Sequence, residues 1–143
     1  MVLVGPACNL PPSAGVIGWP VAHSKSPVIH RFWLEKRGLD GDYSRFPVHP
    51  DHLGAAIRAL PALGLRGVNV TIPHKVAIIE YLDALAPSAA AVGAVNTVAV
   101  TAAGLIGHNT DVAGLAGPIA GHGAGRPIVI LGAGGAARAA LAV

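Results

Sequence analysis

The chain has 143 residues, of which 52% are hydrophobic and 12% charged, and its formal net charge is +3. This composition is typical of a globular domain with a buried core, and it excludes an intrinsically disordered chain. The basic residues are scattered, which argues against nucleic acid as a partner, and no run of eighteen apolar residues predicts a membrane span.

The first thirteen residues form a leader punctuated by prolines. From residue 14 on, short apolar runs alternate with segments that begin with helix-start residues. The Ser26-Pro27 pair, for example, predicts a helix with Ser26 as its N-cap. In chain order, the expected elements are a strand at 14–21, a helix at 26–37, a strand at 43–49, a helix at 50–60, a strand at 67–72, a helix from 73 that buries Val76, Ile79 and Leu82, a short helix after 87–88, a hairpin of 95–101 and 105–109, and a short helix from 111. This alternation predicts an α/β fold with a mostly parallel sheet.

The last quarter of the chain differs in composition. The glycines of residues 117–126 predict a flexible linker. The apolar residues 127–131 predict a strand, and an Ala-rich helix is expected from residue 136. One strand, one turn and two helical turns are too short for a βαβ unit, which needs roughly 30 residues. We therefore expect a fragment with one domain at 14–116 and the truncated start of a second at 125–143.

A glycine motif, Gly132-x-Gly134-x-x-Ala137, follows the last predicted strand and opens a helix. This context is what a dinucleotide-binding fingerprint requires: Gly132 would allow the tight turn and Gly134 the close approach of a pyrophosphate. The alternative is an ordinary turn in an Ala- and Gly-rich chain, and the motif alone does not separate the two. In such a fingerprint, a residue about 20 positions further on distinguishes NAD from NADP, and that position lies past Val143.

Polar residues occur where the strand at 67–72 ends. Asn69 and Thr71 are two apart and share one face, and Lys75 begins the next helix. Ligands bind at strand ends in open α/β sheets, so Lys75 is a candidate proton donor. The alternative is an exposed lysine at a helix start, which these residues alone favour.

Two further groups of residues are candidates for a site. The predicted hairpin brings Asn96 and Asp111 together, so that Asp111 could pair with Lys75, cap the following helix, or do both. Ser24 and Ser26 at a helix start form a candidate carboxylate cradle, or Ser26 simply caps the helix. The sequence contains no G-x-S-x-G motif for a serine hydrolase, and its histidines lack metal-ligand spacing.

Six segments together resemble the shikimate dehydrogenase family: VIGWPVAHSKSPVIH, YSRFPVHPDHL, GLRGVNVTIPHK, VGAVNT, GHNTD and VILGAGGAARAAL. They occur in the family's order and cover nearly all of residues 15–143. The resemblance implies an N-terminal three-layer α/β substrate domain with a mostly parallel sheet, followed by the truncated start of a Rossmann domain. It also implies the NADP-dependent, reversible reduction of 3-dehydroshikimate to shikimate in aromatic amino-acid biosynthesis.

Site residues are carried over by position. The resemblance implies that Lys75 and Asp111 are catalytic. It implies substrate contacts from Ser24, Ser26, Thr71, Asn96 and Asp111. It implies cofactor contacts from Gly132, Ala133, Gly134, Gly135 and Ala136, and no metal. Two residues depart from the family pattern: Val112 replaces a common glycine beside the site, and Pro87 puts a cofactor contact at that position in doubt.

Two other functions stay open on the sequence. One is an NAD-dependent quinate/shikimate dehydrogenase, and the other is a non-catalytic small-molecule-binding domain, against which the glycine turn at Gly132 argues. The expected partner is a small molecule, with neither nucleic acid nor membrane, and a homodimer is left open. The single cysteine, Cys8, excludes an internal disulfide and fits a cytoplasmic location.

Overall fold

The computed structural model describes residues 11–120 and 128–143. The strands are β1 (Ser13–Gly18), β2 (Asp42–Pro47), β3 (Leu65–Val70), β4 (Ala84–Leu85), β5 (Thr97–Thr101) and β6 (Gly104–His108). The helices are α1 (Ser26–Lys36), η1 (Pro50–His52), α2 (Leu53–Ala59), α3 (His74–Ala77), η2 (Ile78–Tyr81), α4 (Pro87–Val92), α5 (Asp111–Ile119) and α6 (Gly135–Leu141), where η marks a 3₁₀-helix. In these two ranges, no helix is both long and apolar enough to cross a membrane.

The six strands form one sheet in the order β2-β1-β3-β5-β6-β4. Strand β1 is parallel to β2 and β3, and β4 is parallel to β6, whereas β5 is antiparallel to both of its neighbours. The β5–β6 hairpin lies where the sequence predicts it. The sheet is thus mostly parallel, and the predicted α/β class is confirmed.

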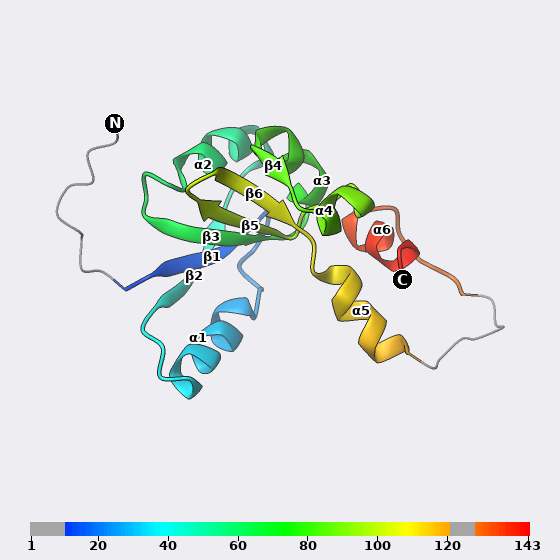
Figure 1. The fold of residues 1–143 in the computed structure, drawn as a ribbon, viewed down its shortest axis with the longest axis horizontal. Helices are drawn as coiled ribbons and strands as arrows, with labels where there is room; N and C mark the ends of the chain where they lie inside the picture. The colour runs from blue at the N-terminus through cyan, green and yellow to red at the C-terminus, as the bar shows by residue number, and fades with distance from the viewer. Residues whose placement is uncertain (1–10, 121–127) are drawn as a thin grey trace.

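Helices cover both faces of this sheet (Figure 1). Neighbouring residues of β1 point to opposite faces, yet Val16 and Ile17 are both buried, as expected for a strand covered on two sides. Val16 packs with Tyr43 in a small cluster, and α1 lies over β2 and β1. Ile17 belongs to the main core, to which α2 and η2 contribute Leu53 and Ile78. The expected three-layer arrangement is confirmed.

The segment after Pro73 differs from the single helix that the sequence predicts. It forms the four-residue α3 followed by the 3₁₀-helix η2, and the tighter winding changes which side chains face inward. His74 and Ile78 are buried, while Val76, predicted to face the core, is 39% exposed. The His74 imidazole lies 2.8 Å, through Nε2, from the carbonyl oxygen of Val48, so its burial leaves no polar atom unpaired.

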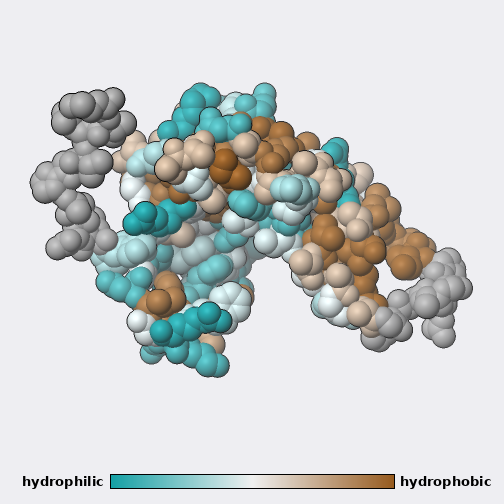
Figure 2. Space-filling view, in the orientation of Figure 1, coloured by the Kyte–Doolittle hydropathy of each residue, from teal (hydrophilic) through white to brown (hydrophobic). Residues whose placement is uncertain are grey.

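The C-terminal region also departs from the prediction. Helix α5 continues to Ile119 over the first residues of the predicted linker, whose residues 121–127 lie outside the described part, as do residues 1–10 of the leader. Residues 128–131 form no strand, because none of the described strands pairs with their backbone. Their side chains are consequently open, with Leu131 95% exposed. Figure 2 shows apolar surface gathered over this end of the molecule, and α6 follows as predicted.

Close approach of β3 and β5 depends on a glycine. Gly67 lies opposite Ala99 in the ladder, and a Cβ atom on Gly67 would overlap the carbonyl oxygen of Val98. Because the obstacle is backbone in the middle of the sheet, it cannot move aside as a side chain would. The absence of a side chain at Gly67 therefore allows β3 and β5, which carry Asn69 and Thr97, to pair this closely.

We expect Gly67→Ala to lower the free energy of unfolding by about 1–3 kcal/mol, the usual cost of overpacking a core. Urea denaturation measures it. The matched control is Gly114→Ala in α5, where a new Cβ would have no neighbour within 4 Å and where alanine is the better helix former. The control should be as stable as the wild type or more so. Equal stability of Gly67→Ala and the wild type would contradict the packing argument.

Candidate active site

Four polar segments meet at one edge of the sheet because of its topology. Strands β1, β3 and β6 run in the same direction, so their carboxyl ends and the start of the antiparallel β5 share that edge. The loop after β1 and the loop after β3 are joined there, since the Trp19 amide donates to the Ile72 carbonyl oxygen at 2.9 Å. The predicted site residues from residue 24 to 111 all follow or precede these strand ends.

Lys75 and Asp111 form the charged pair of the site. The Lys75 ammonium donates to Asp111 Oδ2 at 2.6 Å, and the two side chains are 17% and 24% exposed. The other carboxylate oxygen, Oδ1, accepts from Asn96 Nδ2 at 2.7 Å. Asp111 is also the first residue of α5, where the helix dipole favours negative charge. Three elements thus hold one carboxylate in place.

Capping at α5 and α1 differs from the prediction. Asp111 does not cap its helix through its side chain; instead its backbone amide donates to Asn109 Oδ1 at 2.9 Å, which leaves the carboxylate for Lys75. Ser26 is not an N-cap either but the first residue of α1, and its amide donates to Ser24 Oγ at 3.3 Å. In both cases the polar side chain two residues earlier accepts a hydrogen bond from the backbone amide of the residue that was predicted to be the cap.

The Asn96 amide is fixed from both ends. Its Oδ1 accepts from the Thr97 hydroxyl at 2.9 Å and from the Thr110 amide at 3.1 Å. Its Nδ2 donates to Thr110 Oγ1 at 2.8 Å as well as to Asp111. Because Oδ1 receives a backbone N–H, the nitrogen must face the carboxylate. Thr97 and Thr110 were not assigned a role from sequence, although each stands directly beside a predicted site residue.

The serine pair lies in the loop that enters α1. The Ser24 hydroxyl donates to Ser26 Oγ at 3.2 Å, and both side chains are half-buried. Arg45 of β2 donates from Nε and Nη2 to the Ser24 carbonyl oxygen at 2.8 and 2.5 Å. This arginine fixes the loop and brings a positive charge to it. The sequence prediction missed Arg45, whose signal is a lone cation within the apolar and polar alternation of β2.

A cavity of about 790 Å³ opens between the loop after β3 and the glycine turn. Thr71 and Lys75 line one side, and residues 134–137 line the other. Ser24, Ser26, Asn96 and Asp111 do not line it, so Lys75 marks the place where the cavity meets the polar cluster. In the described ranges, no group of three or more His, Cys, Asp or Glu side chains is arranged to hold a metal ion.

The glycine turn at 132–135 is open on one side and packed on the other. Gly132 has φ +134°, in the region that favours glycine, and a Cβ on Gly132 or Gly134 would meet nothing within 4 Å. At Gly135 a Cβ would lie 2.9 Å from Lys75 Cβ and 3.2 Å from Ala94 Cβ. The turn therefore offers room for a ligand at its first glycines and packs directly on the lysine stem at its last.

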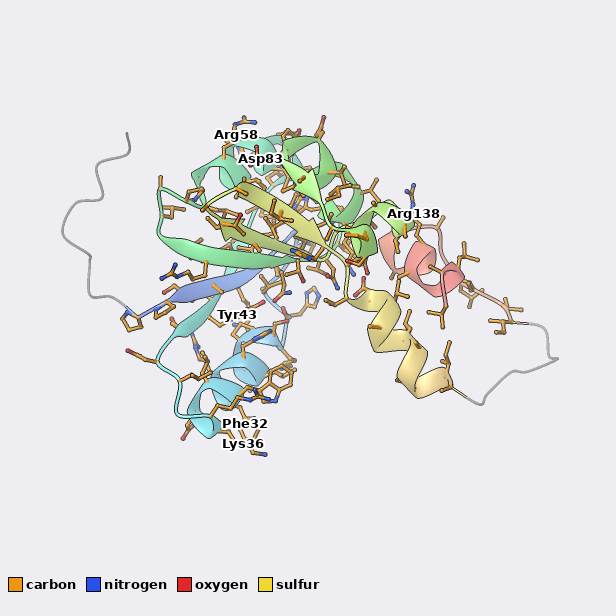
Figure 3. The ribbon with its side chains drawn as sticks, viewed as in Figure 1. Phe32, Lys36, Tyr43, Arg58, Asp83 and Arg138 are labelled. Carbon is orange, nitrogen blue, oxygen red and sulfur yellow. The ribbon has the colours of Figure 1, made fainter. Side chains whose placement is uncertain are left out.

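Helix α6 holds the turn in this position. Its Ala139 is fully buried in a cluster with Val92 and Ala94, against which Val112 packs. Arg138 donates from Nη1 to the Gly93 carbonyl oxygen at 3.1 Å, and Figure 3 shows it on α6 beside α4. Val112, which stands where the family commonly has glycine, packs in the contact between α5 and α6.

Comparison with known proteins gives a consistent result. Residues 16–98 match the family model described as the shikimate dehydrogenase substrate binding domain. The shikimate dehydrogenase (NADP(+)) of Citrifermentans bemidjiense is 53% identical over 133 residues, which cover 90% of this chain and 46% of that protein. The chain thus spans about half the length of the curated relatives it matches.

Solved structures agree with this assignment. A shikimate dehydrogenase in complex with NADP+ has a TM-score of 0.82 at 44% identity, over 90% of this chain and 46% of that one. The Thermus thermophilus enzyme in complex with shikimate has a TM-score of 0.77 at 39% identity, over 90% and 50% of the two chains.

Because the glycine turn packs on Lys75, Gly135→Ala should destabilise the position of α6, although helix propensity alone would favour alanine. Alanine is the better helix former by about 1 kcal/mol, yet its Cβ would push α6 away from Lys75 and Ala94. We expect faster amide hydrogen exchange throughout α6 in this variant. Gly134→Ala is the matched control, because its Cβ would enter open space, and it should leave the exchange rates unchanged. Equal protection of α6 in both variants would contradict the contact.

Proposed function

Because the chain belongs to the shikimate dehydrogenase family, we propose that its gene product reduces 3-dehydroshikimate to shikimate reversibly with NADPH, as a cytoplasmic enzyme. The observation that carries this proposal is the Lys75–Asp111 pair, held at 2.6 Å where the polar cluster meets the cavity below the glycine turn. Since the chain spans about half of its relatives' length, the activity proposed is that of the complete gene product.

Lys75 is the proton donor in this proposal. When a ketone is reduced, its carbon gains a hydride and its oxygen gains negative charge, and an ammonium group beside that oxygen can donate the proton. In the reverse direction the same nitrogen accepts the proton from the alcohol. Asp111 keeps the Lys75 ammonium at one position, and Asn96 holds the far oxygen of the carboxylate. The positive charge is thereby oriented before the substrate binds.

Substrate recognition is proposed for the residues around this pair. The Ser24 and Ser26 hydroxyls can each turn a hydrogen to the carboxylate of the substrate, and the Arg45 guanidinium, which binds the same loop from β2, favours an anion. Thr71, Asn96 and Asp111 would bind the ring hydroxyls, with the Asp111 carboxylate accepting from one of them. This arrangement places carboxylate recognition and proton transfer in different loops at one sheet edge.

The cofactor would be held by the glycine turn. The residues fit a pyrophosphate, because Gly132 and Gly134 leave open the space that a Cβ would fill and a helix begins at Gly135. Gly132, Ala133, Gly134, Gly135 and Ala136 are the proposed contacts. When bound, NADPH supplies the hydride, and the relatives are named for NADP(+). An assay with NADPH and NADH in parallel decides the cofactor preference.

Removal of the proton donor should lower kcat far more than it raises KM, because Lys75 acts mainly on the transition state. We expect Lys75→Ala in the complete gene product to lose about 10²–10⁴-fold in kcat, the usual contribution of a general acid. Asp111→Asn should be comparably severe, and the double variant should lose less than the product of the two losses. Steady-state kinetics measures all three.

The matched control is Lys36→Ala at the exposed end of α1, which should retain wild-type kcat (Figure 3). Near-normal kcat in Lys75→Ala would overturn the mechanism. Full additivity of the two losses would separate Asp111 from Lys75.

Loss of the serine hydroxyls should weaken substrate binding instead. Ser24→Ala and Ser26→Ala are each expected to raise KM for shikimate about tenfold, with a smaller change in kcat, since the carboxylate contact is made before and during the reaction. Calorimetric titration with shikimate provides a readout independent of turnover. Ser13→Ala, at the opposite end of β1, is the control and should bind as the wild type does. Unchanged affinity in both serine variants would remove the cradle from the proposal.

A further inference from the structure

Tyr43 is a buried ionisable residue that the proposed reaction does not use. It lies on the edge strand β2, is 4% exposed, and its ring stacks on His30 of α1 with centroids 4.0 Å apart (Figure 3). Burial raises the pKa of Tyr43 to about 12. The hydroxyl is therefore protonated at neutral pH and acts as a hydrogen-bond donor.

The direction of each hydrogen bond around Tyr43 follows from chemistry. Asn69 Nδ2 donates to Thr97 Oγ1 at 3.0 Å and faces the Asn96 carbonyl oxygen, so Asn69 Oδ1 must be the atom that faces Tyr43. That oxygen can only accept, so the Tyr43 hydroxyl donates to it, at 2.6 Å.

These bonds join into one chain in which every donor points the same way. It starts at the Tyr43 hydroxyl, and it ends at the Asp111 carboxylate, which also accepts from Lys75. The links, in order, are Tyr43, Asn69, Thr97, Asn96 and Asp111. A chain of this kind is polarised along its whole length, and an anion at its end strengthens each bond.

We propose that Tyr43 is a positioning residue that holds Asn96, and through it the Asp111 carboxylate of the Lys75–Asp111 pair, by this chain. The inference rests on the proposed function, because Asn96 and Asp111 are two of its proposed substrate contacts. Tyr43 itself touches neither; it acts through Asn69 and Thr97.

Loss of the Tyr43 hydroxyl would release the Asn69 side-chain amide. Asn69 Oδ1 would lose its donor, so the amide could turn over and present its oxygen to Thr97. Thr97 would then donate to Asn69 and no longer to Asn96 Oδ1. One of the two donors that hold the Asn96 amide against Asp111 is lost in this way.

The test is a double-mutant cycle in the complete gene product. Tyr43→Phe keeps the ring and its stacking, and Thr97→Val removes the hydroxyl two links away at nearly constant volume. We expect each variant to lower kcat/KM for shikimate about tenfold, as for the loss of one hydrogen bond. The double variant should lose little more than either single one, whereas independent sites would multiply to about a hundredfold. KM for NADP should not change.

A matched control separates positioning from stability. His30→Leu removes the stacked ring and leaves the Tyr43 hydroxyl in place, so it should lower the melting temperature and keep kcat/KM. Wild-type kcat/KM in Tyr43→Phe, or fully multiplicative losses in the double variant, would overturn the positioning role alone. A wild-type gene product with no shikimate-dependent reduction of NADP would overturn the proposed function and this inference together.

Discussion

The site depends on the ion pair between Lys75 and Asp111, because it draws together segments that are 36 residues apart in the chain. Lys75 is the second residue of the helix after β3, and Asp111 is the first residue of the helix after β6, so neither could reach the other unless the hairpin β5–β6 folded back along β3. Most other polar contacts of the region orient one of the two partners. Asn96 binds the second carboxylate oxygen, Asn109 binds the Asp111 amide, and the Val95 amide donates to the Lys75 carbonyl oxygen at 2.7 Å.

Much of this arrangement could be predicted from the sequence, because apolar runs, turn residues and the hairpin are local signals. The contact between Lys75 and Asp111 was one of several alternatives, and the resemblance to a family favoured it. The pairing order of the strands was less accessible, since it depends on which faces become covered once the helices have packed. Tyr43 and Arg45 illustrate the limit: each acts through residues more than twenty positions away, and no local pattern distinguishes them from ordinary strand residues.

Errors occurred where another interaction, local or tertiary, competed with the signal in the sequence. Ser26 and Asp111 have the residue types of N-caps, but a polar neighbour supplies the bond in each case. Residues 128–131 have the composition of a strand, and strand formation requires a neighbour that none of the described strands provides. Val76 was expected to be buried on helical periodicity, and the change to a 3₁₀-helix at Ile78 moved the apolar face.

Arg45 has a consequence beyond holding its loop. Its guanidinium lies at the solvent-exposed edge of the sheet and binds a neutral carbonyl oxygen, so its charge is not cancelled by that partner. A fixed cation beside the proposed anion site would raise the local concentration of small anions, and such an effect extends over about 10 Å at 0.1 M salt. The rate at which a carboxylate ligand arrives should thus fall with ionic strength, while the proposed contacts of the serine hydroxyls would set the rate at which it leaves. Capture and retention of the ligand would in this way depend on different side chains, one on β2 and two at the start of α1.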